Sequence, residues 1–183
     1  MKQLHLNIAS ILSQNVLNGI AHVSDLEFSR LVNQLLWSER IFIYGSGKSR
    51  VIGEMFSMRL SSLGKKTFFS NQNTAPSMNS DDILLIISES GSSSLSTLYA
   101  HQAKNIGASI TTLCLPYDLE NKKHLHNISD LCITINPHLN QTEQNQLFRY
   151  YPEINMFPLG NGFEISSLFL LESVIASLMQ QTL

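Results

Sequence analysis

Hydroxyl and glycine residues cluster in two short stretches of the sequence, and each stretch follows an apolar run. The denser one is SESGSSSLS, residues 88–96, directly after ILLII at 83–87. The other is GSGKS, residues 45–49, directly after IFIY at 41–44. Glycine lets the backbone approach an anion closely, while serine hydroxyls and free backbone N–H groups donate hydrogen bonds to its oxygens. Both stretches therefore have the chemistry of a phosphate-binding turn.

The first stretch matches neither common nucleotide motif. It lacks the spacing G-x-x-x-x-G-K-[ST], and the third glycine of G-x-G-x-x-G would fall at Arg50, with Gly53 too late. For the second stretch, the alternatives are a solvated linker or an ordinary helix cap, since one serine commonly caps a helix. Five serines among residues 88–94 exceed what a cap uses. We therefore favour phosphate binding.

Hydrophobic periodicity predicts the elements that position these turns. Two helices are expected in residues 1–38, and SDLE at 24–27 reads as the capping box that opens the second. The elements expected after them are strand 41–44, helix 48–63, strands 66–70 and 83–87, helix 95–106, strand 109–115, a helical stretch near 119–127, strand 131–135 and helix 162–179. Continuous apolar strands that alternate with helices predict an α/β fold, a three-layer αβα, doubly wound parallel sheet. We expect one domain over residues 1–183, with the αβα core in 39–183.

Composition limits the class of protein. Hydrophobic residues make up 43% and charged residues 14%, which is typical of a folded globular chain. The net charge of −2 and the lack of a basic stripe argue against a nucleic-acid partner. No apolar run approaches the length of about 20 residues that spans a bilayer, and the N-terminus is unlike a signal peptide. We therefore expect a cytoplasmic protein with no membrane partner.

The cysteines and histidines give no sign of a metal. Cys114 and Cys132 both fall inside predicted strands, where a free thiol packs as a small apolar group. The six histidines lack a metal-ligand spacing such as H-E-x-x-H. We expect no metal and no cofactor.

Several segments together resemble the sugar-isomerase (SIS) domain family, most closely its 6-phospho-3-hexuloisomerase branch. They are IFIYGSGKS with MRLSSLG, TAPSMNSDDILLIISESGSSS, AKNIGASI and PLGNGFE, in the family's order. The S-x-S-G turn after a strand is a fairly specific mark of SIS domains, and PLGNGFE is typical of the hexuloisomerases. The resemblance implies a five-stranded, flavodoxin-like parallel sheet. It also implies a homo-oligomer, a dimer or tetramer, with sites shared between subunits.

Carried onto this sequence, the resemblance implies a sugar-phosphate site. The phosphate ligands would be Ser49, Ser88, Ser90 and Ser93, and close backbone approach would come from Gly45, Gly47 and Gly91. Glu164 matches the family's catalytic base, which would move a proton between adjacent carbons through an enediol. Lys48 and Arg59 are further candidates for substrate contact. The plainer alternatives are an ordinary helix-start glutamate for Glu164 and a surface ion pair for Arg59.

The sequence also departs from the family pattern. Lys48 stands where hexuloisomerases usually have arginine. Glu89 stands where a small residue is usual, and it would repel a phosphate unless it points away or pairs with Lys48. The chain ends at Leu183 without the family's C-terminal tail histidine. No proton donor is evident, because histidines 101, 124, 126 and 138 each read more simply as structural or solvated residues.

Three functions follow from these observations. The leading one is a phosphosugar isomerase that interconverts 3-hexulose 6-phosphate and fructose 6-phosphate. The second is a non-catalytic phosphosugar sensor, which Glu89 and the absent tail favour. The third and weaker one is a flavodoxin-like nucleotide or flavin binder. The polar loop 136–155, with its FRYY motif, is interpreted as a lid or interaction patch, and the apolar N-terminal helices are consistent with oligomer packing.

Overall fold

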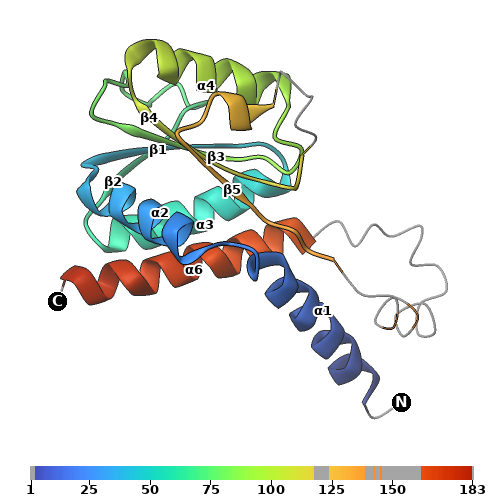
Figure 1. Ribbon diagram of the computed structural model, residues 1–183. Coiled ribbons are helices and arrows are strands. Elements are labelled where there is room, and N and C mark those ends of the chain that lie inside the picture. Colours follow the sequence, from blue (N-terminus) through green and yellow to red (C-terminus); the bar gives the residue numbers. More distant parts are fainter. Residues whose placement is uncertain (1–2, 118–123, 139–141, 143–144, 146–161, 183) are drawn as a thin grey trace.

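The computed structural model describes residues 3–117, 124–138, 142, 145 and 162–182 (Figure 1). Its elements are α1 (Leu4–Ile20), α2 (Asp25–Trp37), β1 (Arg40–Gly45), α3 (Lys48–Ser62), β2 (Lys66–Phe69), β3 (Ile83–Ile87), α4 (Ser94–Ile106), β4 (Ser109–Cys114), the 3-10 helix η1 (Leu125–Asn127), β5 (Leu131–Thr134) and α6 (Gly162–Thr182). These bounds differ from the sequence-based ones by only a few residues. Of the helical stretch expected near 119–127, only the end is described, as η1.

The five strands form one parallel sheet in the order β2-β1-β3-β4-β5. From β1 the chain moves to the edge strand β2 and then returns past β1 to β3, so the strand order reverses between β1 and β3. Helices α2, α3 and α6 cover one face of the sheet, and α4 and η1 cover the other (Figure 1). The predicted doubly wound αβα architecture is confirmed.

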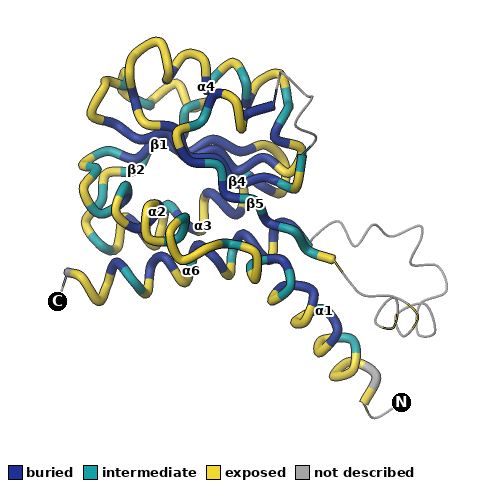
Figure 2. The backbone as a smooth tube through the Cα atoms, in the orientation of Figure 1, coloured by how far each residue is buried: buried dark blue, intermediate teal, exposed yellow. Residues whose placement is uncertain are grey.

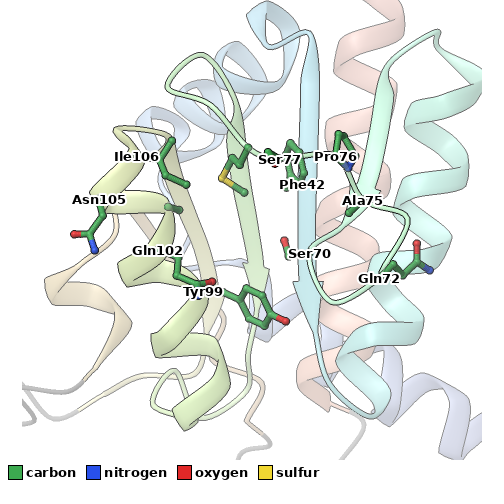
Figure 3. Close-up of a pocket in the computed structure, with 12 residues that line it drawn as sticks. Phe42, Ser70, Gln72, Ala75, Pro76, Ser77, Tyr99, Gln102, Asn105 and Ile106 are labelled. Carbon is green, nitrogen blue, oxygen red and sulfur yellow. The ribbon is translucent and has the colours of Figure 1, made fainter.

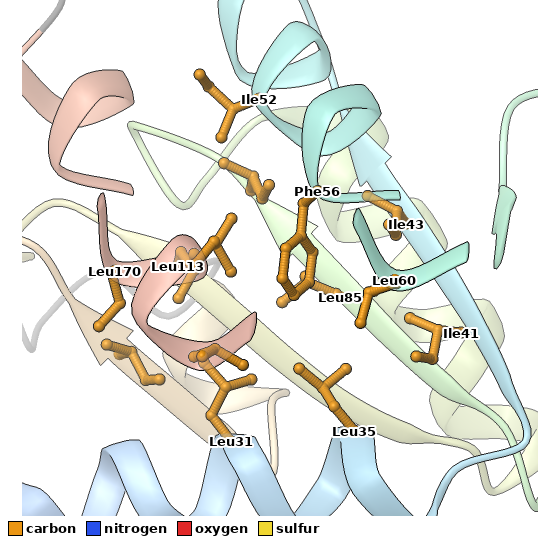
Figure 4. Close-up of a cluster of buried hydrophobic side chains, with 14 of the residues drawn as sticks. Leu31, Leu35, Ile41, Ile43, Ile52, Phe56, Leu60, Leu85, Leu113 and Leu170 are labelled. Carbon is orange, nitrogen blue, oxygen red and sulfur yellow. The ribbon is translucent and has the colours of Figure 1, made fainter. Parts of the chain in front are cut away.

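Each face of the sheet has its own hydrophobic cluster. Successive side chains of a strand point to opposite faces, so Ile41 and Ile43 of β1 join Phe56 of α3 in one cluster (Figure 4). Phe42 and Tyr44 join the other cluster, under α4. Apart from the first residues of β1 and β4, all three central strands are buried along their length (Figure 2), which explains why β1 and β3 contain unbroken apolar runs.

Local signals define several element ends. The capping box is present: the Ser24 side chain accepts a hydrogen bond from the Glu27 N–H, and the Glu27 carboxylate accepts one from the Ser24 N–H. Gly64 and Gly107 follow α3 and α4 with φ of +82° and +86°, the left-handed conformation that ends many helices.

The two cysteines lie in adjacent strands on one face of the sheet. Cys114 is buried, Cys132 is half-buried, and their sulfur atoms are 3.5 Å apart. Both are free thiols. The prediction that they are strand residues is confirmed.

Helix α6 corrects one expectation. Over Gly162–Gln181 it is long and apolar enough to cross a membrane by length and composition alone, although the sequence reading found no such stretch. Its apolar character has a packing explanation, because α6 contacts α1, α2 and α3 at once. Leu171, Val174 and Leu178 are almost fully buried in these contacts. Scattered serines and two glutamates hide this helix from a search for unbroken apolar runs.

Candidate functional site

The two serine- and glycine-rich turns lie side by side at the carboxyl edge of the sheet. Gly45, the last residue of β1, pairs with Ile87, the last residue of β3. The first turn (residues 45–49) and the second turn (residues 88–93) therefore start next to each other. This is the point where the strand order reverses, and α/β sheets bind ligands there. Each turn also enters a helix whose first N–H groups have no partner within the helix.

Two glycines shape the first turn. A Cβ atom at Gly45 would lie 2.9 Å from backbone atoms of Ser49 and Arg50, which is too close for any other residue without a shift. Gly47 has φ of +56° and is the N-cap of α3, where it has no side chain to cap the helix. Ser49 is buried in the first helical turn. Among the described residues, the N-cap thus leaves the first N–H groups of α3 without a side-chain cap.

The second turn is held by the chain segment that follows β4. The Leu115 N–H donates to the Glu89 carbonyl at 2.9 Å, and the Leu125 N–H donates to the Gly91 carbonyl at 2.8 Å. Gly91 has φ of +60°. Because these two carbonyl oxygens accept hydrogen bonds from Leu115 and Leu125, they point away from the N–H side of the turn. An anion on the N–H side would therefore not face them.

The serines of the second turn have different environments. Ser88 is buried and Ser90 is exposed. Ser93 is the N-cap of α4, where its hydroxyl accepts a hydrogen bond from the Ser96 N–H and lies 2.6 Å from the Ser96 hydroxyl. The helix-cap alternative is therefore correct for Ser93. Its role as a phosphate ligand stays a prediction, as do those of the other serines.

Glu164 is a buried acid beside the first turn. It lies in the first helical turn of α6, is 5% exposed, and has its Oε1 3.5 Å from the Lys48 ammonium. Its Oε2 is buried without a hydrogen-bond partner among the described residues. A buried carboxylate oxygen is costly to leave unpaired. The unpaired Oε2 therefore makes Glu164 a candidate functional residue. Glu89, by contrast, is exposed.

His124 is a site residue whose position the sequence did not reveal. It is 1% exposed, and its ring fills the space beside Gly91, where a Cβ atom would lie 2.1 Å from its Nε2. That Nε2 has no hydrogen-bond partner among the described residues. Burial lowers the pKa of His124, and the charge of nearby His126 lowers it further. The Ser90 backbone, which favours the protonated ring, raises this pKa by a smaller amount. No sequence spacing signals this contact, because it depends on how the chain returns to the sheet between β4 and β5.

Comparison with known proteins identifies the family. The SIS domain profile matches residues 34–144. The chain belongs to the SIS domain family. The 3-hexulose-6-phosphate isomerase of Methanocaldococcus jannaschii is 30% identical over 151 residues, which are 82% of this chain and 73% of that protein. The 3-hexulose-6-phosphate isomerase of Methylomonas aminofaciens is 28% identical over 167 residues, 91% of this chain and 84% of that one.

A solved structure agrees with these SIS relatives. It is a protein of Methanococcus jannaschii whose crystal structure was presented as inferring a molecular function of 3-hexulose-6-phosphate isomerase. Its TM-score against this chain is 0.76 at 29% identity, with 95% of this chain and 90% of that chain covered. The five-stranded SIS fold expected from the sequence is confirmed.

Arg59 lies away from the turns of this SIS domain. It stands 11 residues after Lys48 on the same helix, or about 16 Å along the axis. Its Nε is 3.2 Å from an oxygen of Glu172, and both side chains are exposed. The geometry matches the surface-pair alternative, and nothing in it supports substrate contact by Arg59.

Lys48 and Arg59 give a matched pair of variants. We expect Lys48→Met to weaken the binding of fructose 6-phosphate about tenfold, because it removes the cation that lies in the first turn beside the buried carboxylate. Arg59→Met loses only an exposed ion pair and should bind within about twofold of the unaltered protein. Isothermal titration calorimetry measures both, and equal losses would contradict this assignment.

The lowered pKa of His124 predicts a pH-dependent stability. Below its ordinary pKa of 6.5, the unfolded chain binds a proton there that the folded chain does not, so the free energy of unfolding falls as the pH drops from 6.5 toward the folded pKa. His124→Gln removes this contribution. Urea unfolding at pH 7.5 and 5.5 compares the two proteins. A stability difference that is the same at both pH values would show that His124 does not titrate in this way.

A cavity of about 500 Å³ also opens on the α4 face of the sheet (Figure 3). It lies between the loop 70–82 and α4, and Phe42, Tyr99 and Gln102 are among its walls. None of the described residues that line it is charged, and α4 contributes its later turns rather than its N-terminus. A phosphate therefore has better partners at the two turns than in this cavity.

The remaining predictions have mixed outcomes. The FRYY motif at 148–151, interpreted as part of a lid, lies outside the described residues. His101 and His138 are exposed. Within the described part of the chain, no group of three or more His, Cys, Asp or Glu side chains is arranged to hold a metal ion.

Proposed function

We propose that this SIS protein is a phosphosugar isomerase that interconverts 3-hexulose 6-phosphate and fructose 6-phosphate. The observation that carries the proposal is the buried Glu164 carboxylate, paired with Lys48 of the first glycine- and serine-rich turn. The names of the related proteins support this substrate class, since relatives from two organisms are 3-hexulose-6-phosphate isomerases.

The two turns bind the sugar phosphate in this proposal. Ser88, Ser90 and Ser93 donate from the second turn, where Gly91 brings the backbone close. In the first turn, Gly45 and Gly47 allow close approach and Ser49 adds a hydroxyl. Dipoles at the N-termini of α3 and α4 favour the negative charge of the phosphate.

Glu164 is the base. Starting from fructose 6-phosphate, its carboxylate takes the proton from C3, which leaves an enediolate across C2 and C3 with its negative charge on O2. A proton passes from the O3 hydroxyl to O2, the same carboxyl group returns the carbon-bound proton to C2, and the carbonyl then stands at C3. The Lys48 ammonium stabilises negative charge that develops on the enediol oxygens. This arrangement needs no metal or redox group.

The proposal includes three further expectations, on domain organisation, location and assembly. The chain acts as a single domain, residues 1–183, in the cytoplasm. It assembles as a dimer or tetramer, an expectation supported by exposed apolar side chains on α3 and α6, such as Val51, Met58 and Phe169. Gel filtration with light scattering tests the assembly, and a clean monomer would count against it.

The test of the reaction is deuterium exchange. Fructose 6-phosphate is incubated with the protein in heavy water, and the labelled carbon is found by NMR. Label at C3 is the expected result, whereas label at C1 would indicate an aldose–ketose isomerase instead. If no label appears although the sugar phosphate raises the melting temperature, the non-catalytic sensor replaces the isomerase.

A further inference from the structure

His124 and the second turn form one packed unit. The ring of His124 occupies the position that a side chain at residue 91 would take. The next residue, Leu125, donates its N–H to the Gly91 carbonyl at 2.8 Å. Gly91 is thus contacted both by the ring of His124 and by the backbone of Leu125. These contacts restrict a residue that, as a glycine with φ of +60°, would otherwise have more backbone freedom than any other type.

The ring of His124 is itself fixed from behind. Its Nδ1 accepts a hydrogen bond from the His126 N–H at 3.1 Å. The ring stacks on Tyr117 with centroids 4.4 Å apart, and the ring of His126 also stacks on this tyrosine, with centroids 4.5 Å apart. Because Nδ1 is an acceptor, the proton of the neutral ring lies on Nε2, the atom nearest Gly91. The hydrogen bond and the stacking hold the ring in one orientation, with its Nε2 directed at Gly91.

We propose that His124 is a positioning residue that holds the second turn in the conformation that binds phosphate. Without the ring, the backbone at Gly91 can adopt conformations that do not bind phosphate. Ligand binding must then order this backbone, and the entropy cost of that ordering reduces the affinity. The inference rests on the proposed function only in taking the second turn as the phosphate site. It gives His124 no contact with the carbon atoms that react.

Two substitutions separate positioning from packing. His124→Ala removes the ring, whereas His124→Gln keeps a neutral side chain whose amide nitrogen reaches as far as Nε2. Titration calorimetry with fructose 6-phosphate and with inorganic phosphate should show about a tenfold weaker Kd for alanine with both ligands. The glutamine variant should bind within about threefold of the unaltered protein. In the isomerase assay, alanine should raise KM about tenfold and leave kcat within about twofold.

Several results would overturn the inference. One is an alanine variant that binds both ligands as tightly as the unaltered protein. Another is a variant with normal Kd and a low kcat, which would give His124 a catalytic role instead. If circular dichroism shows that His124→Ala does not fold, His124→Leu takes its place, because leucine keeps buried volume without reaching Gly91 as the ring does, and the same tenfold loss is expected.

The assays also separate this inference from the proposed function. Unaltered protein that binds inorganic phosphate but neither binds nor isomerises fructose 6-phosphate would refute the proposed isomerase, and the phosphate titrations of the variants would still decide the role of His124. Unaltered protein that binds neither ligand would overturn both.

Discussion

Replacement of Glu164 by glutamine is expected to lower kcat for isomerisation about a thousandfold, because general base catalysis contributes a factor of about 10²–10⁴. Glutamine has nearly the same shape and is neutral, so it fits the buried position beside Lys48. It cannot accept the C3 proton. Binding of fructose 6-phosphate depends on the turns, and the Kd should therefore change by no more than about threefold.

Two measurements check this result. Deuterium uptake at C3 of fructose 6-phosphate should fall in parallel with kcat, while calorimetry should show that the ligand still binds. Glu172→Gln is the matched control, because Glu172 lies on the same helix, has a partly exposed side chain and pairs only with the surface residue Arg59 among the ion pairs of the described residues. A Glu164→Gln protein that keeps a tenth or more of the unaltered kcat would place the base elsewhere.

The fold was predictable because its signals are local. The run Ile83–Ile87 is a strand with the bounds that its apolar residues predict. The box at Ser24 and Glu27 opens a helix, and Gly64 and Gly107 close two others through positive φ values. Each of these features depends on residues only a few positions apart, so one sequence is enough to find it. The membrane-length apolar character of α6 was missed because serines and two glutamates interrupt its apolar residues, so no unbroken apolar run marks the helix.

The site was predictable only in part. Serine and glycine turns that follow neighbouring strands of a parallel sheet must meet at one edge, so the positions of Gly45 and Ser88 followed from the topology. The pairing of Lys48 with Glu164 joins residues on different helices, and the packing of α3 against α6 sets it. The contact of His124 with Gly91 has no sequence signal at all. Such contacts depend on the packed tertiary structure rather than on local pattern.

Gly91→Ala is expected to weaken the binding of fructose 6-phosphate at least about a hundredfold and to lower the free energy of unfolding by about 2–3 kcal/mol. Two costs combine. An alanine at φ of +60° is strained by about 1–2 kcal/mol. Its Cβ would also lie 2.1 Å from Nε2 of His124, so either the stacked ring or the backbone of the turn must move.

Two further variants separate these costs. Gly64→Ala is the control for strain, since Gly64 has φ of +82° and no atom within 4 Å of an added Cβ. It should lose only about 1 kcal/mol of stability and bind the sugar phosphate normally. The double variant Gly91→Ala, His124→Gly removes the clash, and it should be more stable than the sum of the single losses. Its affinity should nevertheless remain low, because the ring that positions the turn is gone.

Urea unfolding and calorimetry on five proteins give the result: the unaltered protein, Gly91→Ala, Gly64→Ala, His124→Gly and the double variant. If Gly91→Ala is no less stable than Gly64→Ala and binds fructose 6-phosphate normally, the second turn accepts a side chain and the His124 ring is free to move aside. Strictly additive losses in the double variant would instead show that the ring and the glycine act independently. The expected non-additivity, with stability recovered and affinity still low, distinguishes a ring that merely fills space from one that sets the conformation of the phosphate turn.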